Sequence, residues 1–436
     1  MKLTLPAKLL QTLAPWRNAP AWQIAFSGGL DSCVLLHLLA NAEGLPPLRA
    51  IHIHHGLQAA ADAWPAHCQS VCDSLGVPLR TMRVQVRSGA SVERAARDAR
   101  YQAFAEVIAA GEVLLTGQHC DDQAETLLFR LLRGAGVRGL SAMPVHRPLA
   151  GGYLVRPLLD VSRAQLEAYA HEHQLKWIED PSNADPRFSR NYLRHRVFPL
   201  LTERWPQAVS SLARTAEHLS EAQGLLDELA RMDLQAADQS SPFPWLQLPS
   251  LRLASLRELS DARQRNAVRH WLTPLTRLPD SDHWAGWCCL RDAKGDAQPQ
   301  WRLADGELHR CGERIWWVPA TWSQFSHATV TWPSAQNPLE LPGNGRLEFI
   351  EKVPEGPLEI RYRQGGEIVE VPGRGRRDLK RLLNECGVPG FMRGRLPLLY
   401  RGEHLLAVPT LAGLWPNPTG DWQLHWIPQT CDQGLS

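Results

Sequence analysis

Short apolar runs alternate with amphipathic stretches over the first third of the chain, which is typical of strands that alternate with helices. The predicted strands are residues 22–26, 48–54, 79–86 and 113–116, and the predicted helices are 33–39, 59–75, 92–110 and 122–132. This order predicts an α/β fold with a parallel, Rossmann-like sheet that carries helices on its faces. Ligands bind such sheets at the carboxyl ends of the strands, so residues that follow the predicted strands are the candidates for ligand binding.

The pattern changes twice further along the chain. A capping box at Ser162 and Gln165 predicts one more helix, and residues 189–196 are also expected to be helical. A long amphipathic run over 207–232 then leads to a Pro/Ser-rich stretch, and short β-like runs begin near Pro333. We therefore expect a catalytic domain over 1–215, a helical middle domain over 216–335 and a small α+β C-terminal domain over 336–436.

Composition adds little to this picture beyond the class of protein. The 436 residues carry a formal net charge of +2, and the nine cysteines are scattered without the paired spacing of a zinc site. No stretch approaches the roughly 20 apolar residues of a membrane span, and the N-terminus does not resemble a signal peptide. We expect a cytoplasmic protein with reduced thiols and no membrane association.

The most informative motif is the hexapeptide Ser27–Ser32 (SGGLDS), which joins a predicted strand to a predicted helix. Paired glycines let the backbone approach a ligand, and the hydroxyls and the N–H groups that open the helix can hold phosphate. Taken alone, two glycines before a helix could also be only a tight turn. The loop lacks the lysine of a Walker A motif and resembles instead the loop of the N-type ATP pyrophosphatases. That resemblance implies ATP and Mg²⁺ as cofactors, with Asp31 placing the metal or the nucleotide.

A second motif, Thr116–Thr126 (TGQHCDDQAET), also lies where a predicted strand meets a helix. Asp122 and Glu125 are spaced i, i+3, so they share one face of the helix and could bind an ammonium group or magnesium. The alternative is that acidic residues in a first turn only complement the helix dipole.

Two arginines and three histidines are further candidates. Arg97 and Arg100 share a face of the predicted helix 92–110, where guanidinium groups could hold phosphate oxygens, although a solvated helix surface explains them as well. His52 and His54 point to one side of a strand and His55 to the other, which argues against a metal site. We expect these histidines to line the nucleotide pocket at the end of the strand.

The C-terminal segment is strongly basic. Ten basic residues and four acidic ones lie between Arg361 and Arg401. Such a surplus is typical of a surface that contacts the phosphates of a nucleic acid in a salt-dependent and largely sequence-independent way. An exposed basic face without a partner is the alternative.

Taken in order, these motifs resemble the bacterial tRNA(Ile)-lysidine synthetases. The resemblance covers SGGLDS, HIHHGL, the helix with Arg97 and Arg100, DDQAET, the segment RFSRNYLR at 187–194 and the basic segment near the C-terminus. It implies that ATP adenylates the carbonyl oxygen on carbon 2 of the wobble cytidine in a CAU-anticodon isoleucine tRNA. The ε-amine of L-lysine then displaces AMP to form lysidine, which changes codon reading from AUG to AUA.

The resemblance also implies a role for each matching residue. ATP would be held by Ser27, Gly28, Gly29, Leu30, Asp31 and Ser32 with His52 and His54. Catalysis would depend on Asp31, Arg97, Arg100, Asp122 and Glu125, of which Asp122 and Glu125 would hold lysine and Asp31 the metal. Contacts with tRNA would come from Arg190, Asn191, Arg194, Arg374, Arg376, Arg377, Lys380 and Arg381.

Other functions remain open at this point. A tRNA sulfur transferase of the same superfamily would share the loop and the basic surface but would need reactive cysteines, and no CxxC pair is present. A non-catalytic, nucleotide-gated tRNA-binding protein would not need this set of carboxylates and arginines. An amidotransferase relative would bring a glutaminase domain with an N-terminal catalytic cysteine, and no cysteine precedes Cys33 in this sequence. A homodimer is compatible with the sequence, which does not define the oligomeric state.

Overall fold

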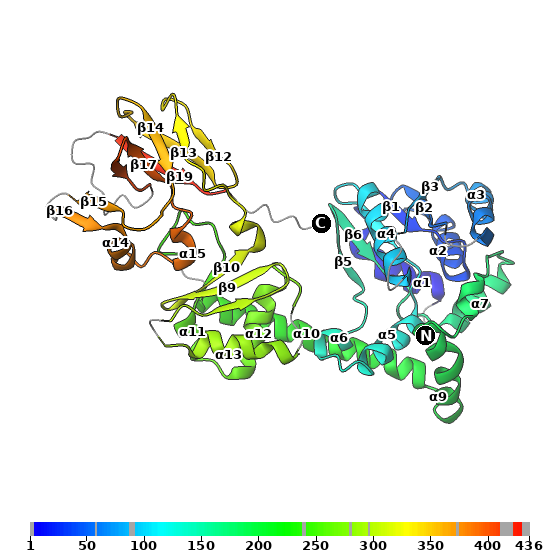
Figure 1. Ribbon diagram of the computed structural model, residues 1–436. Helices are drawn as coiled ribbons and strands as arrows, with labels where there is room; N and C mark the ends of the chain where they lie inside the picture. Colours follow the sequence, from blue (N-terminus) through cyan, green and yellow to red (C-terminus); the bar gives the residue numbers. More distant parts are fainter. Residues whose placement is uncertain are drawn as a thin grey trace. The chain divides into compact units, whose positions relative to one another are not determined.

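The chain forms two compact units, Met1–Leu225 and Leu226–Ser436, and helix α10 (Ala208–Ala237) runs across the division (Figure 1). This is a computed structural model, and it describes residues 4–56, 59–86, 92–237, 241–278, 281–294, 297–371, 375–409 and 422–429. None of the helices in these ranges is both long enough and apolar enough to cross a membrane. The domain boundaries expected at 215 and 335 stay predictions.

The first unit contains a six-stranded sheet with the order β3-β2-β1-β4-β6-β5. All neighbours are parallel except the edge pair of β5 and β6, which is antiparallel. The strands are β1 (Trp22–Ala25), β2 (Leu48–His54), β3 (Leu79–Arg83), β4 (Val113–Leu115), β5 (His146–Leu149) and β6 (Gly152–Val155). The predicted α/β fold with a parallel sheet is confirmed, while the hairpin of β5 and β6 was not predicted.

Helices cover both faces of this sheet (Figure 1). The covering helices are α1 (Leu5–Leu13), α2 (Leu30–Ala40), α3 (Trp64–Ser74) and α7 (Arg163–Glu172) on one face and α4 (Val92–Val107) on the other. Helices α5 (Cys120–Leu131), α6 (Val137–Leu140), α8 (Ser189–Tyr192) and α9 (Phe198–Arg204) pack among themselves and with α10. The period of two along each strand divides the core. Val113 and Leu115 pack with α1, α2 and α7, whereas Leu114 packs with α4 on the other face.

Two helix boundaries differ from the sequence prediction in ways that affect the site. Helix α2 begins at Leu30, which places Asp31 and Ser32 in its first turn. The predicted helix 189–196 is only partly α-helical, because α8 ends at Tyr192 and a π-helical turn follows over Leu193–Val197. Such turns are uncommon and often lie at functional sites.

The second unit begins with helices packed on a small antiparallel sheet of order β7-β10-β9-β8. Figure 1 shows α11, α12 and α13 beside β9 and β10. The elements are α11 (Leu253–Arg257), α12 (Asp261–Leu272), α13 (Ala285–Asp292), β7 (Ser250–Arg252), β8 (Gln300–Arg302), β9 (Gly306–Cys311) and β10 (Arg314–Pro319). Trp287, Trp301 and Trp317 fill the core between helices and sheet. The helices match the prediction for this region, whereas the sheet was not predicted.

The remainder of this unit is α+β, as predicted. Its elements are β11 (Val330–Trp332), β12 (Leu339–Leu341), β13 (Gly345–Glu351), β14 (Leu358–Arg361), β15 (Ile368–Val371), β16 (Gly375–Asp378), α14 (Leu379–Glu385), α15 (Gly390–Arg393), β17 (Leu398–Arg401), β18 (His404–Ala407) and β19 (Trp422–Ile427). Phe243, Trp316 and Trp322 share one core with Leu347 and Leu383. Residues on both sides of position 335 are therefore packed together.

Candidate active site

A cavity of about 270 Å³ lies at the carboxyl ends of β1, β2 and β4. Its lining includes Ser27, Asp31 and Ser32 after β1, His52 and His55 from the end of β2, and residues 116–118 after β4. The chain builds the sheet from β1 to β2 and β3 on one side, and β4 then lies on the other side of β1. Such a reversal of strand order is a topological switch point, where α/β sheets bind ligands. The structure therefore places the predicted phosphate loop where the fold favours a ligand.

Local hydrogen bonds fix the conformation of the loop. The Ser27 and Ser32 hydroxyls are 3.1 Å apart, Ser32 Oγ donates to the carbonyl of Gly29 over 2.9 Å, and Gly29 N–H donates to Ser27 Oγ over 3.3 Å. Leu30 is buried below them. The two hydroxyls are thus held together at the start of α2, where the helix dipole favours an anion.

Gly28 has a conformation that requires glycine. Its φ is 81°, and a Cβ atom would lie 2.8 Å from Ile178 Cδ1 and 2.9 Å from Cys68 Sγ. The Gly28 carbonyl accepts a hydrogen bond from the Ile178 N–H over 2.8 Å. A side chain here would strain the backbone and displace the segment that closes over the loop.

His119 is a buried histidine between three carboxylates, and the sequence did not predict it as a site residue. Its side chain is 1% exposed, and its ring nitrogens lie 3.6 Å from Asp31 Oδ1, 3.6 Å from Asp121 Oδ2 and 3.5 Å from Asp122 Oδ2. Burial disfavours the imidazolium, but the three carboxylates outweigh burial and raise the pKa of His119. The three carboxylates thus favour the protonated form of His119, although neither ring nitrogen has a hydrogen-bond partner among the described residues.

Asp31 is held in place by charge more than by hydrogen bonds. Burial raises the pKa of Asp31, and His119 and Arg163 offset only part of this effect. Arg163 Nη1 is 3.8 Å from Asp31 Oδ1, which is itself buried and has no hydrogen-bond partner in the described part of the chain. Arg163 was not predicted as a site residue, because its only sequence signal is the capping box at the start of α7 and the fold alone brings it near Asp31.

Asp122 and Glu125 both contact one arginine. Arg194 Nε donates to Glu125 Oε1 over 2.6 Å, and Arg194 Nη2 lies 3.0 Å from Glu125 Oε2 and 3.2 Å from Asp122 Oδ1. Glu125 is 2% exposed, and burial raises its pKa despite the bound guanidinium. Asp122 lines the cavity, whereas Glu125 lies behind it, bonded to Arg194.

The segment predicted to contact tRNA in this unit makes internal contacts. Arg190 Nη2 donates to Thr126 Oγ1 over 2.8 Å, and its Nε is 3.9 Å from Glu125 Oε2. Asn191 Nδ2 donates to the carbonyls of Ser182 and Asp185. These side chains therefore position α8 against α5, and their proposed role toward tRNA stays a prediction.

Arg97 and Arg100 have different neighbours, although they were expected to share a helix face. Arg100 lines the cavity, together with its neighbour Tyr101. Arg97 lies over the Tyr101 ring at 4.9 Å, and Arg147 lies 5.0 Å from the same ring. Both predicted arginines are exposed, with Arg100 at the wall of the cavity and Arg97 at the ring of Tyr101.

The three predicted histidines have different partners. His52 Nδ1–H donates to the Phe26 carbonyl over 2.9 Å, which leaves its buried Nε2 without a partner in the described structure. Burial lowers the pKa of His52, so it carries a lone pair at Nε2. His54 Nε2 instead lies 3.1 Å from Asp62 Oδ1, and His55 lines the cavity. Sequence reasoning had singled out His52 and His54 for the cofactor.

Only some of the basic residues predicted to contact tRNA in the second unit are shown to be exposed. Arg376, Arg377, Lys380 and Arg381 are exposed on β16 and α14, and Arg381 lies 3.4 Å from Glu385. Arg374 lies outside the described residues. In the same segment, however, Arg361 contacts Glu359 and Glu403, and Arg395 is 3% exposed. The basic surface is therefore smaller than the sequence count implied.

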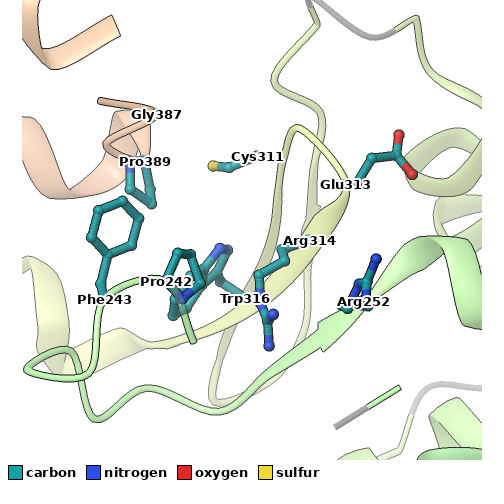
Figure 2. A pocket seen from close by; sticks show the side chains of 9 residues that line it. All are labelled: Pro242, Phe243, Arg252, Cys311, Glu313, Arg314, Trp316, Gly387 and Pro389. Carbon is teal, nitrogen blue, oxygen red and sulfur yellow. The ribbon is translucent and has the colours of Figure 1, made fainter. Parts of the chain in front are cut away.

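A second cavity, of about 410 Å³, lies within this unit (Figure 2). Figure 2 shows Cys311, Glu313, Arg314 and Trp316 around the β9–β10 turn, with Pro389 across from them. Arg252 of β7 also lines it. One acidic and two basic side chains favour neither an anion nor a cation as a ligand.

The fold and the loop define an α/β protein of the PP-loop class, and a family model described as a PP-loop domain matches residues 1–201. Models described as the TilS substrate binding domain and the TilS substrate C-terminal domain match residues 251–316 and 358–426.

Relatives named tRNA(Ile)-lysidine synthase match along almost the whole chain. The protein from Pseudomonas fluorescens (strain Pf0-1) is 64% identical over 436 residues, covering 99% of each chain. The one from Pseudomonas aeruginosa is 63% identical with 99% of each chain covered, and the one from Shigella flexneri is 42% identical, covering 91% of this chain and 92% of the relative. The chain belongs to the tRNA(Ile)-lysidine synthase family. The predicted family is confirmed, and it is favoured over the sulfur transferase.

Proposed function

We propose that this protein uses ATP and L-lysine to convert the wobble cytidine of a CAU-anticodon tRNA(Ile) to lysidine. The observation that carries the proposal is that Ser27, Asp31, Ser32, Arg100 and Asp122 line a single cavity. A loop that suits phosphate, a guanidinium that suits a leaving pyrophosphate and a carboxylate that suits an ammonium group are thus within reach of one bound substrate.

ATP would be held by its phosphates at the start of α2. The paired hydroxyls of Ser27 and Ser32, with the backbone of Gly28 and Gly29, supply the donors. His52 offers an unpartnered nitrogen that could accept from a nucleotide N–H, and His54 would support it from the same strand. Arg100, with Arg97 farther out, would neutralise charge on the departing pyrophosphate.

Mg²⁺ fits this site through Asp31. Magnesium is usually held by one or two carboxylates together with substrate phosphates and water. Asp31 presents a buried oxygen without a hydrogen-bond partner beside the phosphate loop. The ion would neutralise phosphate charge when the cytidine carbonyl oxygen attacks.

The reaction has two steps. The oxygen on carbon 2 of cytidine attacks the α-phosphorus of ATP and releases pyrophosphate, which converts a poor electrophile into one with a good leaving group. The neutral ε-amine of lysine then attacks carbon 2 and expels AMP, and its proton must pass to a base. A carboxylate pair favours the ammonium form. Asp122 and Glu125 would therefore bind lysine first and accept the proton second.

Lysine binding at both carboxylates requires a change in Arg194. The Arg194 guanidinium already contacts both Asp122 and Glu125, so it occupies the position that an ammonium group would take. Lysine would either displace it or bind through Asp122 on the cavity side alone.

The tRNA would contact both units. Arg190, Asn191 and Arg194 would act near the anticodon loop, while Arg374, Arg376, Arg377, Lys380 and Arg381 would contact the phosphate backbone. A cytoplasmic location and a homodimer remain predictions, and light scattering on the purified protein tests the oligomeric state.

The deciding experiment incubates the protein with ATP, Mg²⁺, radiolabelled L-lysine and a tRNA(Ile) transcript with a CAU anticodon. A CAU-anticodon methionine tRNA is the matched control. ATP-dependent label on the isoleucine tRNA alone supports the proposal. Formation of AMP without lysine label on either RNA would overturn it in favour of another nucleophile, with sulfur transfer the first to test.

A further inference from the structure

Two aromatic side chains are exposed together beside the candidate active site. Phe188 precedes α8 and is 38% exposed, and Tyr192 ends α8 and is 52% exposed. The Tyr192 N–H donates to the Phe188 carbonyl over 2.9 Å, so the two residues are one helical turn apart and share a face. Large aromatic side chains are normally buried, and an adjacent exposed pair is informative.

The other face of the same turn is tied to the catalytic carboxylates. Arg190 and Arg194 lie two positions beyond Phe188 and Tyr192, which is about 200° around a helix. Arg190 donates to Thr126, and Arg194 contacts Asp122 and Glu125. The aromatic pair therefore faces away from α5 while its backbone is fixed to the helix that carries the carboxylates.

The loop that leads to this turn starts at the cavity. Asp180 lines the cavity and accepts a hydrogen bond from the Ser182 N–H over 2.9 Å. Asn191 donates to the Ser182 carbonyl over 2.8 Å, which joins the turn back to the cavity rim. A polymer with one unit in the cavity could reach the aromatic pair with a neighbouring unit.

The charge of this segment indicates which class of macromolecule would bind it. Residues 186–198 contain four arginines, of which Arg187 is paired with Asp185 and Arg194 with Asp122 and Glu125, whereas Arg196 is exposed on the surface. A symmetric interface would bring two copies of this basic turn face to face, and like charges oppose such contact. Arginines that alternate with exposed aromatic rings instead suit single-stranded RNA, whose bases stack while its phosphates pair with the cations.

We infer that Phe188 and Tyr192 form a stacking surface for unpaired bases of the anticodon loop beside the cytidine that enters the cavity. This inference rests on the proposed function and names the residues that would orient its RNA substrate. Because Arg194 shares the turn, RNA bound here would also contact the element that holds Asp122 and Glu125.

The test compares Phe188→Ala and Tyr192→Ala with the stacking-competent Phe188→Tyr and Tyr192→Phe. Steady-state kinetics with the full tRNA should show KM for tRNA rising about tenfold for each ring lost, since one stacked base contributes about that factor. The KM for ATP at saturating tRNA and the melting temperature should not change. Trp205→Ala, which removes an exposed aromatic ring after α9, is the matched control and should leave KM for tRNA unchanged.

Leucine separates stacking from simple apolar contact. Phe188→Leu and Tyr192→Leu should resemble the alanine variants, whereas Tyr192→Phe should resemble the wild type. Unchanged KM for tRNA in the alanine variants would overturn the inference, as would rescue by leucine or a change in oligomeric state in place of RNA affinity. Failure of the wild type to transfer lysine would instead refute the proposed function, so the two outcomes are distinguishable.

Discussion

Arg194 in the first unit and Arg395 in the second each contact several partners, but the partners differ in kind. Arg194 contacts the carboxylates of Asp122 and Glu125. Arg395 is 3% exposed, donates to the carbonyls of Trp322 and Gly343 and to Asn344 Oδ1, and lies 4.1 Å from the Trp322 ring. Carboxylates can accept a ligand's ammonium group in place of a guanidinium, whereas carbonyls locked in a core cannot be reached by one.

An arginine with internal ion pairs is therefore a functional candidate when its partners are carboxylates that border a cavity. Arg395 was counted in the basic segment of the sequence, yet it stabilises the core between residues 322 and 395. Arg194 was assigned to RNA, yet its contacts lie at the proposed lysine site. Four changes test this distinction.

The largest expected effect comes from Asp31→Asn, which removes the cavity carboxylate without changing its shape. Lysidine formation should fall about 10²–10³-fold, as expected for loss of one electrostatic contact in a reaction centre. Because burial raises the pKa of Asp31, its carboxylate form is less favourable in the folded than in the unfolded chain, and the variant should unfold no more easily. Activity assays and thermal melts check both, with Asp160→Asn as an exposed control. Retained activity would contradict the role of Asp31.

Arg395→Met should be the most destabilising of the arginine changes. It leaves the Trp322 and Gly343 carbonyls and the Asn344 amide without their donor, at a cost of about 3 kcal/mol. Denaturant unfolding measures the loss. Neither L-lysine nor RNA at saturating concentration should restore stability selectively, since neither can replace the missing donor. A fully stable variant would show that the contacts contribute little.

Arg194→Met should destabilise by about 2 kcal/mol, less than a fully buried pair because the Arg194 side chain is 30% exposed. Without the guanidinium the pKa of Glu125 should rise further, so the stability lost at about pH 8 should be partly regained at about pH 5.

Ligand rescue sharpens this contrast with Arg395. L-lysine should raise the melting temperature of Arg194→Met, because an ammonium group can replace the guanidinium, whereas norleucine, which lacks the ε-amine, should not. A pH-independent loss without rescue by lysine would indicate that Arg194 is structural, like Arg395.

The smallest effect is expected from the exposed basic residues of β16 and α14. The triple change Arg376→Gln, Arg377→Gln and Lys380→Gln should raise Kd for tRNA about tenfold and reduce its salt dependence. The free energy of unfolding should change by no more than about 0.5 kcal/mol. Filter binding at two salt concentrations measures this, with Arg302→Gln, whose partner is Glu307, as the exposed control. An unchanged salt dependence would place the RNA contact elsewhere.

The sequence by itself determined the α/β order of the first unit, the phosphate loop, the motif with Asp122 and Glu125 and the family. Each depends on local spacing, because strand period, helix period and glycine positions are written into neighbouring residues. Helix starts and the sheet in the second unit were missed, since weakly patterned short strands are defined by their partners.

Only the tertiary structure decided which of these residues meet. Arg163 and Arg194 reach the motif carboxylates from segments distant in the chain, and the pKa of His119 is raised because Asp31, Asp121 and Asp122 surround it. Arg395 likewise lies in the core and not on the basic surface, because its partners there are brought together by the tertiary fold. Long-range packing sets burial and the distance between charges, and neither quantity is encoded in the spacing of residues along the chain.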